Sequence, residues 1–95
     1  MVNVRRLVVD LLKPHDPDVV VFAESVAGCE GVAGVNAVLL ETDKEVQNLK
    51  LTIEGESIPV DVVHETVEDL GGTIHSIDEV VCGERIVEES KTPQD

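Results

Sequence analysis

Between residues 31 and 79, two alternating strand patterns, an amphipathic helix and another strand pattern follow one another with almost no spare residues. The two strand patterns cover residues 35–42 and 47–54, and residues 43–45 form the turn between them. In the second pattern, Leu49, Leu51 and Ile53 alternate with polar residues. Because neighbouring side chains of a strand point to opposite faces, this alternation predicts one buried face and one polar face.

A helix is predicted after Gly55, starting at Ser57 and Pro59 and ending at Gly71. Its apolar residues recur at helical spacing and form one stripe, made of Ile58, Val62, Val63, Val67 and Leu70. Residues 73–81 are predicted as the last strand, and their alternation could continue through Ile86 and Val87.

The N-terminal third of the chain predicts a strand followed by a helix. Residues 2–12 alternate as a strand that Pro14 is expected to stop. Asp16 is placed to cap the following helix, with Pro17 in its first turn. This helix is expected to run to about Cys29 and to bury four side chains, those of Val19, Phe22, Ala23 and Val26.

The element order is therefore βαββαβ, which right-handed crossovers fold into a ferredoxin-like α+β sandwich. This fold is a four-stranded antiparallel sheet with two helices on one face. We predict a single domain over residues 1–89, followed by a flexible tail over residues 90–95.

The sheet face without helices is expected to mix polar and apolar residues. It would carry Val8 and some of four further apolar residues, namely Val38, Leu40, Ile77 and Val81. A mixed face favours a homo-oligomer, and the strand-like segment 82–89 could pair with the edge of a neighbouring copy.

The charge of the chain excludes several classes of partner. Twenty acidic residues against seven basic ones give a formal net charge of -13, which repels nucleic-acid phosphates and anionic membranes. Such a surface would be screened in strong salt, so we expect a halophilic source. The sequence shows no signal peptide and no apolar run of about 20 residues, and a cytoplasmic location is therefore expected.

The usual motifs of catalysis and of nucleotide or transition-metal binding are missing, and the sequence predicts no catalytic or cofactor-binding residue. Cys29 and Cys82 form no C-x-x-C pair. In a reducing cytosol they are expected to be thiols, and whether they lie close together stays open.

Four blocks in order resemble an archaeal family catalogued as domain of unknown function 211. They are RRLVVDLLKPHDP, CEGVAGVN, EVQNLKLTIEG and DLGGTIHSIDEVVCGE, and they span nearly the whole chain. The resemblance implies a ferredoxin-like fold, an archaeal source, a ring-like or other oligomer and no established activity. The acidic composition resembles the haloarchaeal branch of that family.

In the predicted fold, several strand and helix ends meet at one edge of the sheet. That edge would gather five candidate metal ligands, namely Asp10, His15, Glu41, Asp43 and His75. Hard cations such as Ca²⁺ or Mg²⁺ bind carboxylate and carbonyl oxygens without a rigid spacing, so the sequence allows a divalent-cation site here. The competing interpretation, which we favour, is that these residues are caps, turns and solvated charges. His75 could also face Asp10 across the strand pair, as a structural contact or as a ligand pair.

The leading hypothesis is a non-enzymatic, oligomeric binding or regulatory module that holds a divalent cation or a small polar ligand at the acidic edge or between subunits. One alternative is a small enzyme with an acid–base site around His75 that is completed by a second subunit. Another alternative is a pure protein-interaction domain that docks through residues 83–95.

Overall fold

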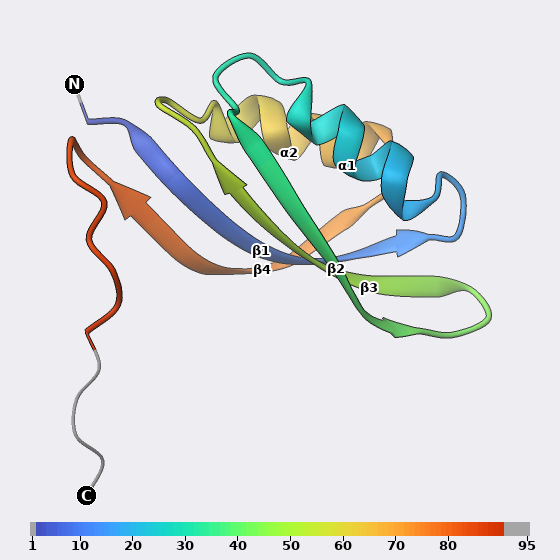
Figure 1. Cartoon of the computed structure of the whole chain (residues 1–95). Coiled ribbons are helices and arrows are strands. Elements are labelled where there is room, and N and C mark those ends of the chain that lie inside the picture. The colour runs from blue at the N-terminus through green and yellow to red at the C-terminus, as the bar shows by residue number, and fades with distance from the viewer. Residues whose placement is uncertain (1, 91–95) are drawn as a thin grey trace, which may run out of the picture.

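The computed structural model describes residues 2–90 and confirms the predicted fold (Figure 1). The elements are β1 (Val4–Pro14), α1 (Val19–Ala27), β2 (Gly34–Thr42), β3 (Val46–Glu54), α2 (Val60–Asp69) and β4 (Thr73–Cys82). The four strands form one antiparallel sheet in the order β2-β3-β1-β4. Both helices cover the same face of this sheet (Figure 1). The opposite face carries no helix and is called the open face below.

The core lies between the helices and the two central strands. Leu7, Val9 and Leu11 of β1 stand opposite Ile53, Leu51 and Leu49 of β3, so that both strands point their apolar rows at the helices. The helices complete the core with Phe22, Val26, Val63 and Val67, all without exposed surface. Val62 is an exception to the predicted stripe because its side chain faces solvent and is 47% exposed.

The first helix begins later than the sequence predicted. Its N-cap is Asp18, whose carboxylate accepts a hydrogen bond from the Val21 amide at 2.9 Å. The prediction that Asp16 caps this helix was therefore wrong. Asp18 takes this role because it directly precedes Val19, the first residue with helical geometry, and a cap must satisfy amides two or three positions further on.

The last strand ends at Cys82, and its predicted extension through Ile86 and Val87 was wrong. Gly83 has a φ of 106°, a left-handed conformation that glycine adopts readily and that turns the chain away from the strand. Residues 84–90 contain no helix or strand. Most of the predicted tail, residues 91–95, lies outside the described part of the chain.

The helices are too short to cover the sheet. Strands of 9 to 11 residues extend about 30–36 Å, whereas helices of 9 and 10 residues extend about 15 Å. Apolar residues on the helix side are consequently left in contact with solvent, among them Leu39 and Ile77. Val38 pairs with Lys50 and is exposed on the open face. Ile77 pairs with the core residue Val9 and so belongs to the helix side, not to the open face as expected.

One charged side chain is buried with the core. Lys13 is 1% exposed, and its ammonium group donates hydrogen bonds of 2.7 Å to the Pro14 carbonyl and to Oε1 of Gln47. Burial lowers the pKa of Lys13, although Asp18 and Asp16 act in the opposite direction. The hydrogen bond to Gln47 ties the end of β1 to the start of β3.

Among the described residues, no helix has the length and apolar character that crossing a membrane requires.

Candidate functional site

The open face of the sheet contains a shallow hollow of about 770 Å³. All four strands contribute to its lining, and one wall comes from residues 83–90, which are called the C-terminal segment below. Val8 and Val81, which were expected on this face, lie among the lining residues and are almost completely buried. The charged residues of the lining are the cations Arg6 and Lys50 and the carboxylates Asp10, Glu54, Asp78, Glu79 and Glu89.

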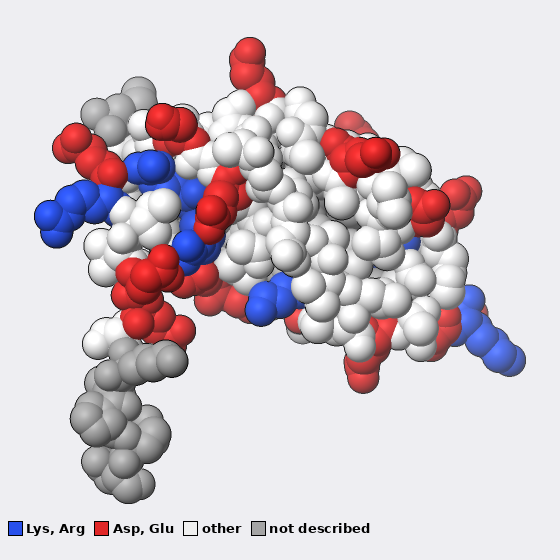
Figure 2. Space-filling model, in the orientation of Figure 1, with Lys and Arg blue, Asp and Glu red and all other residues white. Residues whose placement is uncertain are grey.

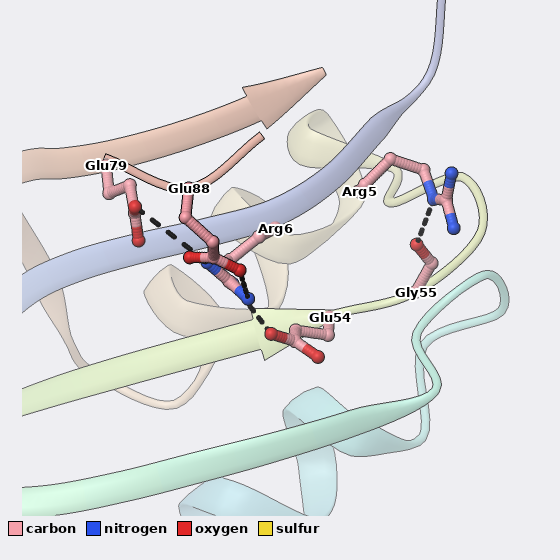
Figure 3. Close-up of polar contacts among 6 residues, drawn as sticks. All are labelled: Arg5, Arg6, Glu54, Gly55, Glu79 and Glu88. Carbon is pink, nitrogen blue, oxygen red and sulfur yellow. Dashed lines mark hydrogen bonds and ion pairs between the residues drawn. The ribbon is translucent and has the colours of Figure 1, made fainter. Parts of the chain in front are cut away.

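Arg6 is the most highly connected side chain of this hollow (Figure 3). Its Nε donates a 2.6 Å hydrogen bond to Glu54. Its two terminal nitrogens donate to the two carboxylate oxygens of Glu88 at 2.8 and 3.1 Å. Glu79 lies farther away, with an oxygen 3.9 Å from Nη1. One guanidinium thus binds carboxylates from β3, from the C-terminal segment and, more weakly, from β4.

The strand register explains this arrangement. Arg6 stands directly opposite Glu54 in the β1–β3 pair, and Glu79 stands opposite Val8 in the β1–β4 pair. Side chains two positions apart on a strand share a face, so these charges converge on the open side. The hydrogen bonds that Arg6 donates to Glu88 and Glu54 raise the pKa of Arg6, and the contact with Arg6 lowers the pKa of Glu88.

Arg5 fastens the start of the C-terminal segment from the neighbouring position on β1. The strand register shifts between Val4 and Arg6, which marks a bulge at Arg5. Its guanidinium donates to the carbonyl oxygens of Gly55, Gly83 and Glu84 at 3.2, 3.2 and 2.8 Å. Because a bulge turns a side chain away from the regular alternation, Arg5 can reach two loops that a regular strand residue would miss. The segment is therefore attached at its start by Arg5 and further along by Arg6.

The side chains of the hollow have a chemistry that suits small charged groups. A guanidinium offers a planar fork of N–H donors that matches the two oxygens of a carboxylate. Glu88 occupies this fork with two parallel hydrogen bonds. Lys50 supplies a second positive charge and stands opposite Asp10 in the strand register. Sequence reasoning did not select Arg6, although Arg6, Val8 and Asp10 occupy alternate positions of the strand predicted over residues 2–12 and therefore share one face.

Of the predicted metal ligands, Asp10 and Glu41 lie on either side of Asn48. The amide nitrogen of Asn48 donates to a carboxylate oxygen of Asp10 and, at 3.1 Å, to the Leu11 carbonyl. Glu41 is the partner of Asn48 in the β2–β3 register, and both line a second, smaller hollow of about 250 Å³. An amide thus stands between two carboxylates on adjacent strands.

His15 and Asp43 are also brought together. Nε2 of His15 lies 2.5 Å from the Asp43 carbonyl oxygen. The Asp43 carboxylate accepts hydrogen bonds of 2.9 Å from the amides of Glu45 and Val46, and these bonds lower its pKa. This carboxylate therefore closes the β2–β3 turn, which is the structural role that we favoured from the sequence.

His75 does not join the other candidates. The residue opposite Asp10 on β4 is Ser76, and a register shift places His75 in a bulge. The expectation that His75 faces Asp10 was therefore wrong. Its strand is also at the opposite edge of the sheet from Glu41, about 14 Å away at the usual strand spacing. Within residues 2–90, no three His, Cys, Asp or Glu side chains lie close enough together to hold a metal ion.

Both cysteines are free thiols. Sγ of Cys29 lies 3.4 Å from the Thr66 hydroxyl of α2, and Cys82 is exposed at the end of β4. On α2, His64 and Glu68 are 3.3 Å apart on an exposed helix face. Cys29 therefore takes part in a contact with α2, and His64 and Glu68 form a solvated surface pair.

The known proteins that this chain resembles are described without an activity. The model of the family described as DUF211, Uncharacterized ArCR, matches residues 5–95. The chain is 50% identical over 95 residues to the uncharacterized protein MJ0319 of Methanocaldococcus jannaschii. That similarity covers 100% of this chain and 98% of the relative.

Proposed function

We propose that this chain, which belongs to the DUF211 family, is a small oligomeric binding module without catalytic activity. Its ligand binds in the hollow on the open face. The observation that carries this proposal is the convergence of Arg6 with carboxylates from three segments of the chain at one place on that face.

The charges of the hollow favour a ligand that has both a carboxylate and an ammonium group. The Arg6 fork would bind the carboxylate in place of Glu88, whose side chain is 68% exposed. Asp10 and Asp78 would bind the ammonium group, because they line the same hollow and make no ion pair within residues 2–90. A molecule with several phosphates is disfavoured because five carboxylates surround the two cations.

The test is a titration of ¹⁵N-labelled protein with glycine, acetate and methylammonium, followed by NMR. Glycine carries both groups, and each of the other probes carries one. We expect glycine to shift the amide resonances around Arg6 and Asp10 more strongly than either other probe. Arg6→Gln should abolish these shifts. Arg85→Gln should keep them, because Arg85 is exposed and makes no ion pair within residues 2–90. Equal responses of wild type and Arg6→Gln would contradict the proposal.

A divalent cation is a second candidate ligand, favoured by the position of Asn48 between Asp10 and Glu41. Asn48 uses its amide nitrogen for two hydrogen bonds, which leaves its carbonyl oxygen available as a ligand. Ca²⁺ and Mg²⁺ bind oxygen atoms of this kind. Because the chain gathers no three carboxylate or imidazole ligands within residues 2–90, the cation would also use oxygens of a second copy.

The cation is tested by thermal unfolding with and without Ca²⁺ or Mg²⁺. Binding to the folded state should raise Tm in a concentration-dependent manner. Asp10→Asn and Glu41→Gln should reduce this increase, whereas Arg6→Gln should leave it unchanged. If neither ion raises the Tm of the wild type, the cation is eliminated while the ligand in the Arg6 hollow remains.

The two other hypotheses receive less support from the geometry. Among the described residues, no His, Cys or Ser lines the hollow, so the acid–base site around His75 has no counterpart there. The C-terminal segment, which a protein-interaction domain would use for docking, is held by Arg5 and Arg6 of its own chain. The oligomeric part of the proposal is supported by the apolar strand residues that the short helices leave uncovered.

A further inference from the structure

The two edges of the sheet differ in how well they are protected against pairing with another strand. β4 forms one edge and β2 the other. Along β4, register shifts at His75 and Asp78 interrupt the ladder, and Glu79 adds a further charge. Bulges and charges are the features by which proteins protect sheet edges. β4 is therefore a protected edge.

β2 has neither form of protection over most of its length. Its pairing with β3 is regular from Gly34 to Leu39, and the only register shift lies at Leu40. Residues 34–40 contain no charged side chain and no proline. A regular, uncharged outer strand presents unpaired N–H and C=O groups in the geometry that another strand needs.

The side chains of β2 indicate a missing partner as well. Val38, Leu39 and Leu40 are 45%, 43% and 46% exposed, and no residue of β2 is fully buried. β3, its neighbour in the sheet, buries three residues over the same length. The apolar composition of β2 thus exceeds what burial within one chain explains.

The uncharged surface extends beyond the strand itself. Figure 2 shows a broad area without charged side chains in the centre of the view, where Figure 1 places β2 and α1. α1 packs over β2 and contains a single charged residue, Glu24. Charged side chains lie mainly around the rim of this area in Figure 2. With a net charge of -13, two copies of this chain repel each other least where they meet at this area.

We propose that two copies of the chain pair through β2, antiparallel and around a two-fold axis, so that their four-stranded sheets join into one. This inference rests on the oligomeric part of the proposed function and names its interface. A two-fold pairing presents the same surface on both copies. If the two-fold axis passes anywhere between Gly34 and Leu39, antiparallel pairing places Glu41 of one copy opposite a residue between 27 and 37 of the other. The two copies of Glu41 therefore stay apart.

A second copy fits this edge better than other occupants. A basic peptide would be attracted to the acidic surfaces of the chain and not to its uncharged area. Pairing β2 with β4 of another copy would set a regular ladder against two bulges and would bring Asp78 and Glu79 into the interface. The β2–β2 arrangement avoids both problems.

The test is the molar mass of wild type and two variants, measured by size-exclusion chromatography with light scattering. Val38→Lys places a charge on β2, and Ile77→Lys is the matched control on β4, where the native side chain is 55% exposed. Each protein is measured at about 0.15 M and about 1 M salt, where the screening length falls from about 8 Å to about 3 Å. We expect an even-numbered wild-type assembly that salt strengthens, half that subunit number for Val38→Lys, and no change for Ile77→Lys.

Three outcomes would overturn the inference: a wild-type monomer at both salt concentrations, an odd subunit number, or an assembly that Ile77→Lys disrupts. If Val38→Lys does not fold, amide hydrogen exchange of the wild type tests the β2–β2 interface instead. Raising the protein concentration should then slow exchange of β2 amides and leave β4 amides unchanged. Ligand binding at Arg6 is measured independently, so a failed ligand test leaves the interface standing, and the reverse also holds.

Discussion

Arg6 and Glu88 are 82 positions apart in the sequence and share two parallel hydrogen bonds of 2.8 and 3.1 Å (Figure 3). This pair holds the C-terminal segment, which has no secondary structure of its own, against the open face. The same guanidinium fork would bind the carboxylate of a ligand. Under the proposed function, the segment and a ligand would therefore compete for Arg6.

Replacing Glu88 should release the C-terminal segment. We expect trypsin to cleave Glu88→Gln after Arg85 severalfold faster than the wild type, because a neutral amide cannot form the charged bidentate pair. Glu84→Gln is the control, since the Glu84 carboxylate makes no ion pair within residues 2–90. High salt should accelerate cleavage of the wild type but hardly that of Glu88→Gln. Equal cleavage rates for the wild type and Glu88→Gln would show that this pair does not hold the segment.

Acid should release the same segment. Arg6 lowers the pKa of Glu88 below its ordinary value of 4.5, so the folded chain keeps this carboxylate charged at a pH where a free one is protonated. The attachment is thus fully present above pH 4.5 and is lost as the pH falls through the lowered pKa. An NMR titration of the Glu88 side-chain carboxyl should show this, and Arg6→Gln should return the pKa to the ordinary range. A wild-type pKa equal to that of Arg6→Gln would contradict the prediction.

Gly55 should not tolerate a side chain. A Cβ at this position would overlap the carbonyl oxygen of Gly31, where two loops cross. Because backbone must move to make room, we expect Gly55→Ala to lower the free energy of unfolding by more than about 1 kcal/mol. Gly34→Ala is the control, since nothing lies within 4 Å of its Cβ position, and its stability should be unchanged or slightly higher. Urea unfolding of the wild type, Gly55→Ala and Gly34→Ala measures the difference. Equal unfolding midpoints would argue against the close contact between Gly55 and Gly31.

Lys13 should make stability depend on pH in the alkaline range. Its pKa in the folded state is lowered from 10.5 by burial, so the unfolded chain binds more protons than the folded one between the lowered pKa and 10.5. Stability conferred by this residue therefore rises as the pH increases through that window. Lys13→Met lacks this contribution. Urea unfolding between neutral pH and pH 10.5 should show that the free energy of unfolding of the wild type rises relative to that of Lys13→Met. If the two free energies change with pH in parallel, Lys13 has no such effect.

The regular elements followed from local patterns. Apolar residues recur at every second position in residues 47–54 and at helical spacing in α2. This spacing decides whether a segment buries one face as a strand or as a helix. The order of these elements then left few ways to connect them, which is why the ferredoxin-like sheet was predictable. Val62, the start of α1, the face of Ile77 and the end of β4 departed from the pattern, because they depend on packing and on single turns that a local period does not specify.

The sequence by itself thus determined the strands, the helices, the two faces of the sheet and the family. The tertiary structure decided which charged residues meet. Strand order separates His75 from Glu41, a bulge takes His75 away from Asp10, and the turn at Gly83 brings Glu88 back to Arg6. The physical reason is that local periodicity fixes the direction of a side chain relative to its own backbone, whereas contacts between distant residues depend on strand register and on single turns. A shift of one residue in a strand register or in a turn changes the partner of every side chain that follows.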